Sequence, residues 1–386
     1  MNYLIIGGGI AGTTTADELR KIDSDAAITI ISNEKHPLYS RVILPHYITG
    51  KVPRERVFLK TMEWYTDNKI DLVFDEVISI DTKAKTVTSS NSSHAYDKLL
   101  IAGGGTVNKL KFPGSENVLH FQTIDDADKI LDLLVKHAND ETKPRVGIIG
   151  GGFIAMEFAE FFGEENYETH IFLRKDRFFS GSFDDNCSQI LENHLAKWQI
   201  KTHKHIEIES YVDGIAKLSD GTELKLDAIA AGVGLSSNFQ WAADAGIEVN
   251  KGIVCNEFLE TNVPDIYTAG DCAEFFDTMS KQHVRIGNWM NALMQSRLLA
   301  KNMTGEKNAF ELVSSFSTKV LGLDIVSIGV TNAAKADEIV ERPSDDGHML
   351  IFGKNGVAVG ATLVNQTKER ARITKLIKER TPISNI

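Results

Sequence analysis

A glycine-rich segment near the start of the chain is repeated further along, and this repeat constrains the fold more than any other feature. Residues 3–6 form a short apolar run that leads into GGGIAG at 7–12, and residues 145–149 lead into GGGFIA at 150–155. In both copies a segment with helical character follows the glycines. A strand, a glycine turn and a helix in succession are typical of an α/β unit with a parallel sheet. The sequence therefore predicts two such units.

The glycine spacing of the first copy has a mechanical explanation. In the pattern G-x-G-x-x-G, Gly7 permits a tight turn, Gly9 lets the backbone approach a pyrophosphate, and Gly12 lets the helix pack closely on the strand. The helix N-terminus then presents its free N–H groups to the anion. A second apolar run, AITIIS, ends just before Glu34, whose carboxylate can accept hydrogen bonds from ribose hydroxyls. These residues predict a dinucleotide site for an unphosphorylated ribose.

The second copy places Gly150, Gly152 and Ala155 at the three corresponding positions. Two dinucleotide sites in one chain indicate electron transfer between two dinucleotides. The alternative, in which one copy is an element of the fold that binds no ligand, stays open.

A basic triplet stands where the second copy should meet its ribose. The predicted strand THIFL ends at residue 173, and it is followed by Arg174, Lys175 and Arg177 in a chain whose formal net charge is −11. A guanidinium group suits bidentate contact with a 2′-phosphate, whereas a carboxylate would repel that phosphate. The triplet therefore predicts that NADPH is preferred to NADH. A basic surface turn that is indifferent to the cofactor is the alternative.

Composition excludes several other classes of protein. The length of 386 residues suits two or three domains, and the acidic net charge argues against general binding of nucleic acid. No run of 18 apolar residues is present, so we expect no membrane span and a cytoplasmic protein. The cysteines, Cys187, Cys255 and Cys272, form no close pair, so neither a disulfide framework nor a metal site is expected.

Taken together, these segments resemble the FAD-dependent pyridine nucleotide oxidoreductases, which are flavoproteins with two dinucleotide-binding domains. FDEVISID at 74–81 and TAGD at 268–271 add to the resemblance. It implies that the first copy binds the ADP half of FAD and that the second binds NAD(P)H. The residues it assigns to FAD are Gly7, Gly9, Gly12, Glu34, Arg41, Val77, Ala102 and Asp271, and those it assigns to the nicotinamide nucleotide are Gly150, Gly152, Ala155, Arg174, Lys175, Arg177 and Gly232.

Within this family the chain is most similar to the rubredoxin reductases and to the flavin module of nitrite reductases. The similarity rests on LYSRVILPHYITG at 38–50, NWMNALMQSRLLAKNMTG at 288–305 and STKVLGLDIVSIG at 317–329. No cysteine precedes Cys187, and Val42 stands where coenzyme A disulfide reductases of this fold carry one. The resemblance thus implies that electrons leave the flavin without a thiol relay.

The resemblance also implies an α/β fold with three domains. These are an FAD-binding domain, an NAD(P)H-binding domain, and a small α+β domain at the C-terminal end that would serve as an interface. The expected ranges are 1–112 with 236–305, then 113–235, and then 306–386.

Three residues are candidates for a catalytic role beside the flavin. His46 replaces the lysine that lies near flavin N5 in ferredoxin reductases, and Glu157 is the glutamate with which that lysine pairs. A His46–Glu157 pair would raise the pKa of the histidine. Trp289 would lie over or beside the flavin. The alternatives are that His46 packs at a turn and that Trp289 packs in the core.

The predicted helix at 365–380 is basic, although the chain as a whole is acidic: it carries six basic and two acidic side chains. Small carriers such as rubredoxin tend to be acidic, so this helix could steer one by complementary charge, although a solvated face is the alternative. The sequence thus predicts a reductase, monomeric or homodimeric, that delivers electrons from NAD(P)H through FAD to a small carrier protein. The other candidate functions are an NAD(P)H oxidase, a small-molecule reductase and a non-catalytic NAD(P)H-responsive flavoprotein.

Overall fold

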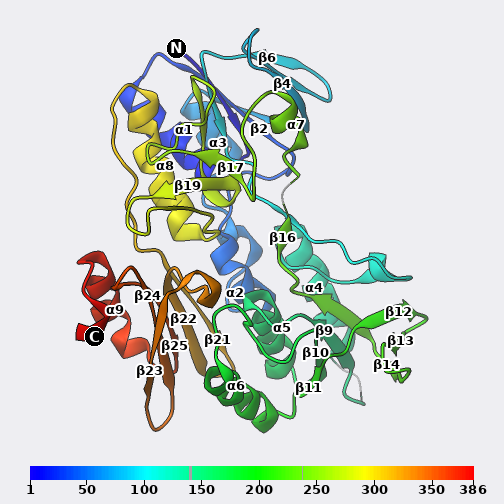
Figure 1. Cartoon of the computed structure of the whole chain (residues 1–386). Helices are drawn as coiled ribbons and strands as arrows, with labels where there is room; N and C mark the ends of the chain where they lie inside the picture. Colours follow the sequence, from blue (N-terminus) through cyan, green and yellow to red (C-terminus); the bar gives the residue numbers. More distant parts are fainter. Residues whose placement is uncertain (139–140, 237) are drawn as a thin grey trace. The chain divides into compact units, whose positions relative to one another are not determined.

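The computed structural model describes residues 1–138, 141–236 and 238–386 (Figure 1). The chain divides into two compact units, and neither is one continuous stretch of sequence. Unit 1 comprises Met1–Ile43, Pro53–Thr106 and Ser236–Ser314, whereas unit 2 comprises Leu44–Val52, Val107–Leu235 and Ser315–Ile386. The segments that the sequence suggests as an NAD(P)H-binding domain and a C-terminal domain therefore share unit 2.

A parallel sheet with the strand order β18-β7-β1-β2-β3 forms the centre of unit 1. Strands β18, β7, β1 and most of β2 are buried, which explains why they read as nearly continuous apolar runs, whereas the edge strand β3 is partly exposed. Helix α1 (Ile10–Ile22) connects β1 to β2, and helix α8 (Trp289–Met303) packs against α1. The strands are β1 (Asn2–Ile6), β2 (Ala27–Ser32), β3 (Ile70–Phe74), β7 (Lys98–Ile101) and β18 (Ile266–Thr268).

Two small sheets complete unit 1. One is antiparallel, with the order β4-β5-β6, and the other has the order β17-β19-β20. Their bounds are β4 (Val77–Asp81), β5 (Thr86–Ser89), β6 (Ser93–Ala95), β17 (Ile253–Cys255), β19 (Ala273–Asp277) and β20 (Gln282–Val284).

The second glycine segment lies in a parallel sheet of unit 2, with the order β11-β10-β9-β15. Helix α5 (Phe153–Glu164) connects β9 to β10, and its apolar side chains are buried nearly all round, as expected for an interior helix. Helix α4 (Ile124–His137) begins with a capping box between Thr123 and Asp126. The strands are β9 (Arg145–Ile149), β10 (Glu168–Leu173), β11 (Lys201–Lys204) and β15 (Ala228–Ala231).

The C-terminal part of unit 2 is an antiparallel sheet with the order β21-β22-β25-β24-β23. Helix α9 (Arg370–Lys378) packs on β22 and β25 (Figure 1). Its residues Ile373 and Ile377 are buried. The strands are β21 (Ser315–Val320), β22 (Leu323–Gly329), β23 (Glu338–Pro343), β24 (His348–Lys354) and β25 (Val357–Val364). The predicted fold class is confirmed. None of the helices in the described residues has the length and apolarity needed to cross a membrane.

Candidate functional site

The first glycine turn forms a cradle at the carboxyl end of β1. Gly7 has φ +110°, and a Cβ there would lie 2.3 Å from the carbonyl oxygen of Ala102, just beyond β7. A Cβ on Gly12 would lie 1.9 Å from the carbonyl oxygen of Gly7, so only glycine lets α1 begin this close to the turn. At Gly9, by contrast, the Cβ position meets no described atom within 4 Å apart from its own chain neighbours. The turn therefore has no room for a side chain at Gly7 or Gly12, but it has open space at Gly9, where a pyrophosphate would approach.

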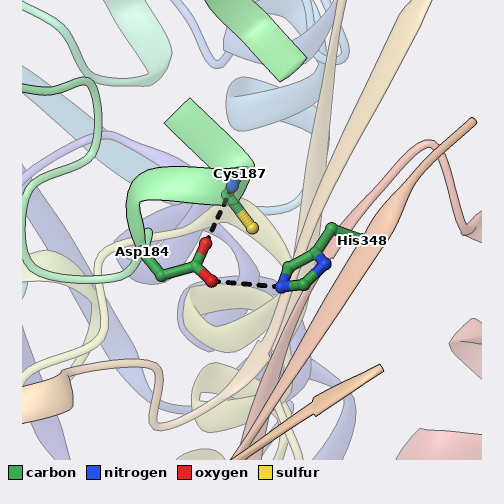
Figure 2. Close-up of side chains that lie close together, drawn as sticks. All are labelled: Asp184, Cys187 and His348. Carbon is green, nitrogen blue, oxygen red and sulfur yellow. Dashed lines mark hydrogen bonds and ion pairs between the residues drawn. The ribbon is translucent and has the colours of Figure 1, made fainter. Parts of the chain in front are cut away.

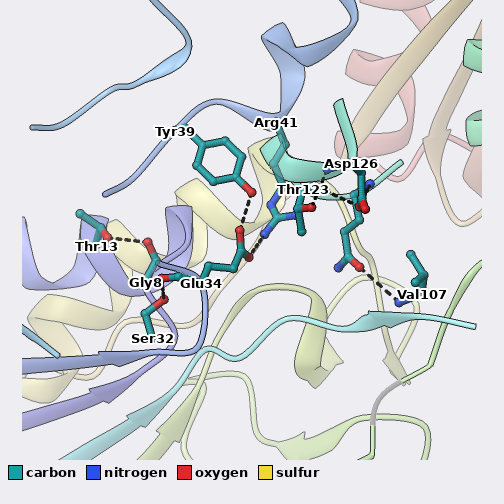
Figure 3. A network of polar contacts seen from close by, with 10 residues as sticks. Gly8, Thr13, Ser32, Glu34, Tyr39, Arg41, Val107, Thr123 and Asp126 are labelled. Atoms are coloured by element: carbon teal, nitrogen blue, oxygen red, sulfur yellow. Dashed lines mark hydrogen bonds and ion pairs between the residues drawn. The ribbon is translucent and has the colours of Figure 1, made fainter. Parts of the chain in front are cut away.

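Glu34 lies two residues beyond β2, at the edge of this cradle (Figure 3). Its carboxylate accepts hydrogen bonds from the hydroxyl of Tyr39 and from the guanidinium group of Arg41. The Ser32 hydroxyl donates to the Glu34 carbonyl oxygen at 3.1 Å, which braces the turn. The structure thus brings Glu34 and Arg41 together, and it adds Tyr39, which the sequence reasoning missed.

Asp271 reaches the same end of the unit 1 sheet, three residues beyond β18. Burial raises the pKa of its carboxyl group, while Arg41 and Arg285 oppose this effect. Gln295 on α8 accepts from the Gly270 backbone N–H at 2.7 Å, and its side-chain nitrogen is buried with no hydrogen-bond partner in the part of the chain that the structure describes. An unsatisfied buried donor beside an open glycine cradle fits a polar ligand.

The remaining residues of the predicted flavin site also lie in unit 1. Val77 begins β4, buried Ala102 follows β7, and Trp289 is the first residue of α8. The side chain of Asn288 caps α8 by accepting from the Asn291 N–H at 2.8 Å.

The second glycine turn repeats the cradle in unit 2 with one change. Gly150 has φ +116°, and a Cβ there would lie 2.4 Å from the carbonyl oxygen of Gly232, just beyond β15. The Cβ position of Gly152 is open, as it is at Gly9. A Cβ on Gly232 would lie only 2.5 Å from the backbone nitrogen of buried Ala155. Gly232, the residue that follows the neighbouring strand β15, therefore makes room for the start of α5.

The basic triplet follows β10, where the sequence predicts a ribose contact. Arg174 and Lys175 are exposed, and neither forms an ion pair with the described residues. Arg177 differs, because its guanidinium group lies 2.9 Å from a carboxylate oxygen of Asp185 and 3.4 Å from one of Asp176. The first two side chains can contact a ligand, while Arg177 holds its own loop.

Glu157 and His46 lie on helices that contact each other, α5 and α2 (Leu44–Ile48). Burial raises the pKa of the Glu157 carboxyl group to about 7. His46 is exposed, and no hydrogen bond or ion pair joins it to Glu157 within the described chain. The neighbouring Tyr47 instead donates to Asp128 of α4 at 2.6 Å, which fixes α2. The structure thus places the two residues on adjacent helices without the predicted pair.

All three cysteines are free and buried. Burial raises the pKa of each thiol, most clearly for fully buried Cys255. They are therefore protonated thiols at neutral pH rather than reactive thiolates. Cys187 lies close to Asp184 and His348 in unit 2, a cluster that the spacing of the cysteines does not predict.

Comparison with known proteins identifies the class. The sequence model of the pyridine nucleotide-disulphide oxidoreductase family matches residues 1–296, and that of the rubredoxin NAD+ reductase C-terminal domain matches residues 317–381. Since the first match covers most of the chain, the protein belongs to the pyridine nucleotide-disulphide oxidoreductase family. The resemblance predicted from the two glycine segments is confirmed.

Several proteins are similar to nearly the whole of this chain. The chain is 27% identical over 387 residues to NADH-rubredoxin oxidoreductase of Clostridium acetobutylicum, a match that covers 99% of this chain and 96% of that protein. It is 28% identical over 395 residues to nitrite reductase (NAD(P)H) of Bacillus subtilis, covering 99% of this chain and 48% of the relative. The chain spans about half the length of that protein and of another Bacillus subtilis relative, the assimilatory nitrate reductase electron transfer subunit.

One solved structure has the same fold as this chain. The crystal structure of putidaredoxin reductase in covalent complex with putidaredoxin matches with a TM-score of 0.90 and 25% identity, and the match covers 99% of this chain and 94% of that one.

Proposed function

We propose that the protein is an FAD-dependent NAD(P)H oxidoreductase that passes electrons to a small electron-carrier protein. The observation that carries the proposal is the pair of glycine turns: in each of them the first glycine, Gly7 or Gly150, leaves no room for a Cβ, and the second, Gly9 or Gly152, faces open space. Two relatives named above, a rubredoxin oxidoreductase and a putidaredoxin reductase crystallised with putidaredoxin, support a protein acceptor.

The residues of unit 1 fit FAD. Bound FAD would accept a hydride and release electrons singly, which is the chemistry that a carrier of one electron requires. Gly9 and the N-terminus of α1 would face its pyrophosphate, and Glu34 would accept from its ribose hydroxyls. Tyr39 and Arg41 hold the Glu34 carboxylate in place for that contact. The other contributors would be Gly7, Gly12, Val77, Ala102 and Asp271.

The residues of unit 2 fit a nicotinamide nucleotide, and we propose NADPH as the preferred one. Gly150, Gly152 and Gly232 would shape the turn that receives its pyrophosphate. Arg174 and Lys175 are exposed beyond β10 and would neutralise a 2′-phosphate. Ala155 would let helix α5 pack closely on its sheet. Arg177 would support the loop that follows β10 through its ion pair with Asp185.

Glu157 is proposed as the group that exchanges a proton during turnover, with His46 and Trp289 as neighbours of the flavin. A carboxyl group whose pKa is about 7 can both hold and release a proton at neutral pH.

We also propose that α9 docks the carrier. All six basic residues of the segment 366–380 are exposed, and the apolar residues Ile373 and Ile377 on the other face fasten the helix to the sheet. An acidic carrier would be attracted to this face.

Anaerobic stopped-flow spectroscopy of the flavin-loaded protein tests the function. We expect NADPH to bleach the flavin band and oxidised rubredoxin to restore it much faster than dioxygen does. Rapid reoxidation by dioxygen and none by rubredoxin would identify an oxidase instead. Slow reoxidation by every acceptor would contradict any electron-transfer role and favour a regulatory flavoprotein.

A further inference from the structure

A cluster of three side chains in unit 2 lies outside the nucleotide cradles (Figure 2). Asp184 is the N-cap of α6 (Asp185–Lys197), and its carboxylate accepts from the backbone N–H of Cys187 at 2.7 Å. This capping bond holds the carboxylate and the thiol on the same side of the first turn. His348, the first residue of β24, reaches them from the C-terminal sheet, with its Nε2 at 3.1 Å from the second carboxylate oxygen.

The donor atoms converge. One oxygen of Asp184, the sulfur of Cys187 and one ring nitrogen of His348 all lie within 4.8 Å of one another. Cys187 is fully buried and His348 is 3% exposed, whereas the Asp184 side chain is 24% exposed and leaves the cluster accessible from one side. A fourth donor is near, because a carboxylate oxygen of Glu341 on β23 lies 3.7 Å from the same histidine nitrogen.

We propose that Asp184, Cys187 and His348 bind a Zn²⁺ ion, with Glu341 or a water molecule as the fourth ligand. Sulfur, imidazole nitrogen and carboxylate oxygen are the donors that zinc takes in proteins, usually in a tetrahedral arrangement. Metal–donor bonds of about 2.0–2.3 Å separate neighbouring donors by roughly 3.3–3.8 Å. The cluster would therefore contract by about 1 Å on binding.

Binding requires no change in oxidation state. The thiol of Cys187 would release its proton to solvent as the zinc–sulfur bond forms, and His348 would bind through the lone pair of neutral Nε2. In that state the metal replaces the hydrogen bond between His348 and Oδ2 of Asp184, while Oδ1 of Asp184 keeps capping α6. The ion would thereby fasten α6, which packs beside β11, to β24 of the C-terminal sheet.

The first test measures zinc in the full-length, flavin-loaded protein after dialysis against metal-free buffer. We expect about one zinc per chain in the parent, and a loss of most of it in Cys187→Ser and in His348→Gln. Glutamine keeps an N–H that can donate to Asp184, so His348→Gln should still fold. The matched control is Cys255→Ser, which alters another buried thiol and should retain the metal.

The second test needs no variant. Crystals of the parent protein grown with Zn²⁺ should show an anomalous peak between Cys187 and His348 at the zinc absorption edge, and added zinc should raise the melting temperature of the parent. The proposal is overturned if the dialysed parent holds less than about a tenth of a zinc per chain. An anomalous peak only elsewhere, such as at His203 and His205, would overturn it as well.

Discussion

At the scale of single residues, the two arginines that follow β10 have different surroundings. Arg177 is held by Asp185 and Asp176, whereas Arg174 projects from the end of the strand without an ion pair among the described residues. An arginine already engaged by carboxylates contributes less positive charge to an incoming phosphate. We therefore expect cofactor choice to depend on Arg174 far more than on Arg177.

Replacing Arg174 by glutamate should reverse the proposed preference for NADPH. The lost contact and the new repulsion should lower kcat/KM for NADPH by about 10- to 100-fold, with little loss for NADH. Steady-state kinetics with both cofactors measure this, and Arg177→Gln is the matched control, expected to change the ratio by less than about threefold. Equal efficiency of the parent with both cofactors would contradict the assignment.

Glu157 has a raised pKa, which predicts a particular dependence of stability on pH. Its ordinary pKa of 4.5 rises to about 7 in the folded protein, so the folded state binds the proton more tightly than the unfolded state does. Folding stability from this group is therefore greatest below pH 4.5 and is lost progressively as the pH rises to about 7.

Glu157→Gln should remove that loss. Urea unfolding at pH 8 should show the variant to be more stable than the parent by about 1–3 kcal/mol, and the difference should shrink towards pH 5. Glu164→Gln, at an exposed position of the same helix, is the control and should show no such trend. A parent and a Glu157→Gln variant with parallel pH profiles would contradict the raised pKa.

Sequence reasoning located most candidate residues because their positions depend on short stretches of chain. The spacing of Gly7, Gly9 and Gly12 is enough to predict the turn that they form. Glu34 and Arg174 follow directly from where strands β2 and β10 end. Tyr39 beside Glu34 and Gln295 beside Gly270 could not be found this way, because hydrogen-bonding side chains carry no spacing signal.

At the scale of elements, α9 combines a buried apolar stripe with an exposed basic face. Its charges are only partly neutralised by the two flanking glutamates, since Arg372 contacts Glu369 at 2.6 Å and Lys375 lies 3.8 Å from Glu379. Exposed pairs of this kind are weak, so the face keeps a positive potential.

Reversing two of these charges should slow the delivery of electrons to an acidic carrier. We expect the double variant Arg372→Glu with Lys375→Glu to reduce rubredoxin about three- to tenfold more slowly at low salt, with reduction of the flavin by NADPH unchanged. The slope of the rate against ionic strength should also flatten. Lys217→Glu with Lys225→Glu makes the same change in net charge on another sheet, and if it slows the carrier equally, α9 is not the docking face.

Contacts between elements that are far apart in the chain could not be predicted from the sequence. The helix that carries Cys187 and the strand that carries His348 are both predictable in kind, but their approach depends on how the C-terminal sheet packs within unit 2. The absence of closely spaced cysteines therefore suggested no metal site, although a thiol, a carboxylate and an imidazole converge.

At the scale of the whole molecule, the chain builds two α/β units of one kind from interleaved stretches of sequence. The glycine repeat predicts both parallel sheets because each strand, turn and helix is local. It does not predict that Leu44–Val52 belongs to unit 2, because that short segment lies between two stretches of unit 1 and is not part of either glycine segment.

The central claim is that each unit holds one dinucleotide, and paired glycine variants test it most directly. The Cβ positions of Gly9 and Gly152 are open, so valine at either site should leave the fold intact while filling the space that a pyrophosphate needs. The decisive measurement is the flavin absorption of each purified variant before and after anaerobic addition of NADPH. We predict that Gly9→Val is colourless, and that Gly152→Val is yellow but bleaches at least about 100-fold more slowly than the parent. A yellow Gly9→Val, or a Gly152→Val that bleaches at the parental rate, would contradict the assignment of FAD to unit 1 and NADPH to unit 2.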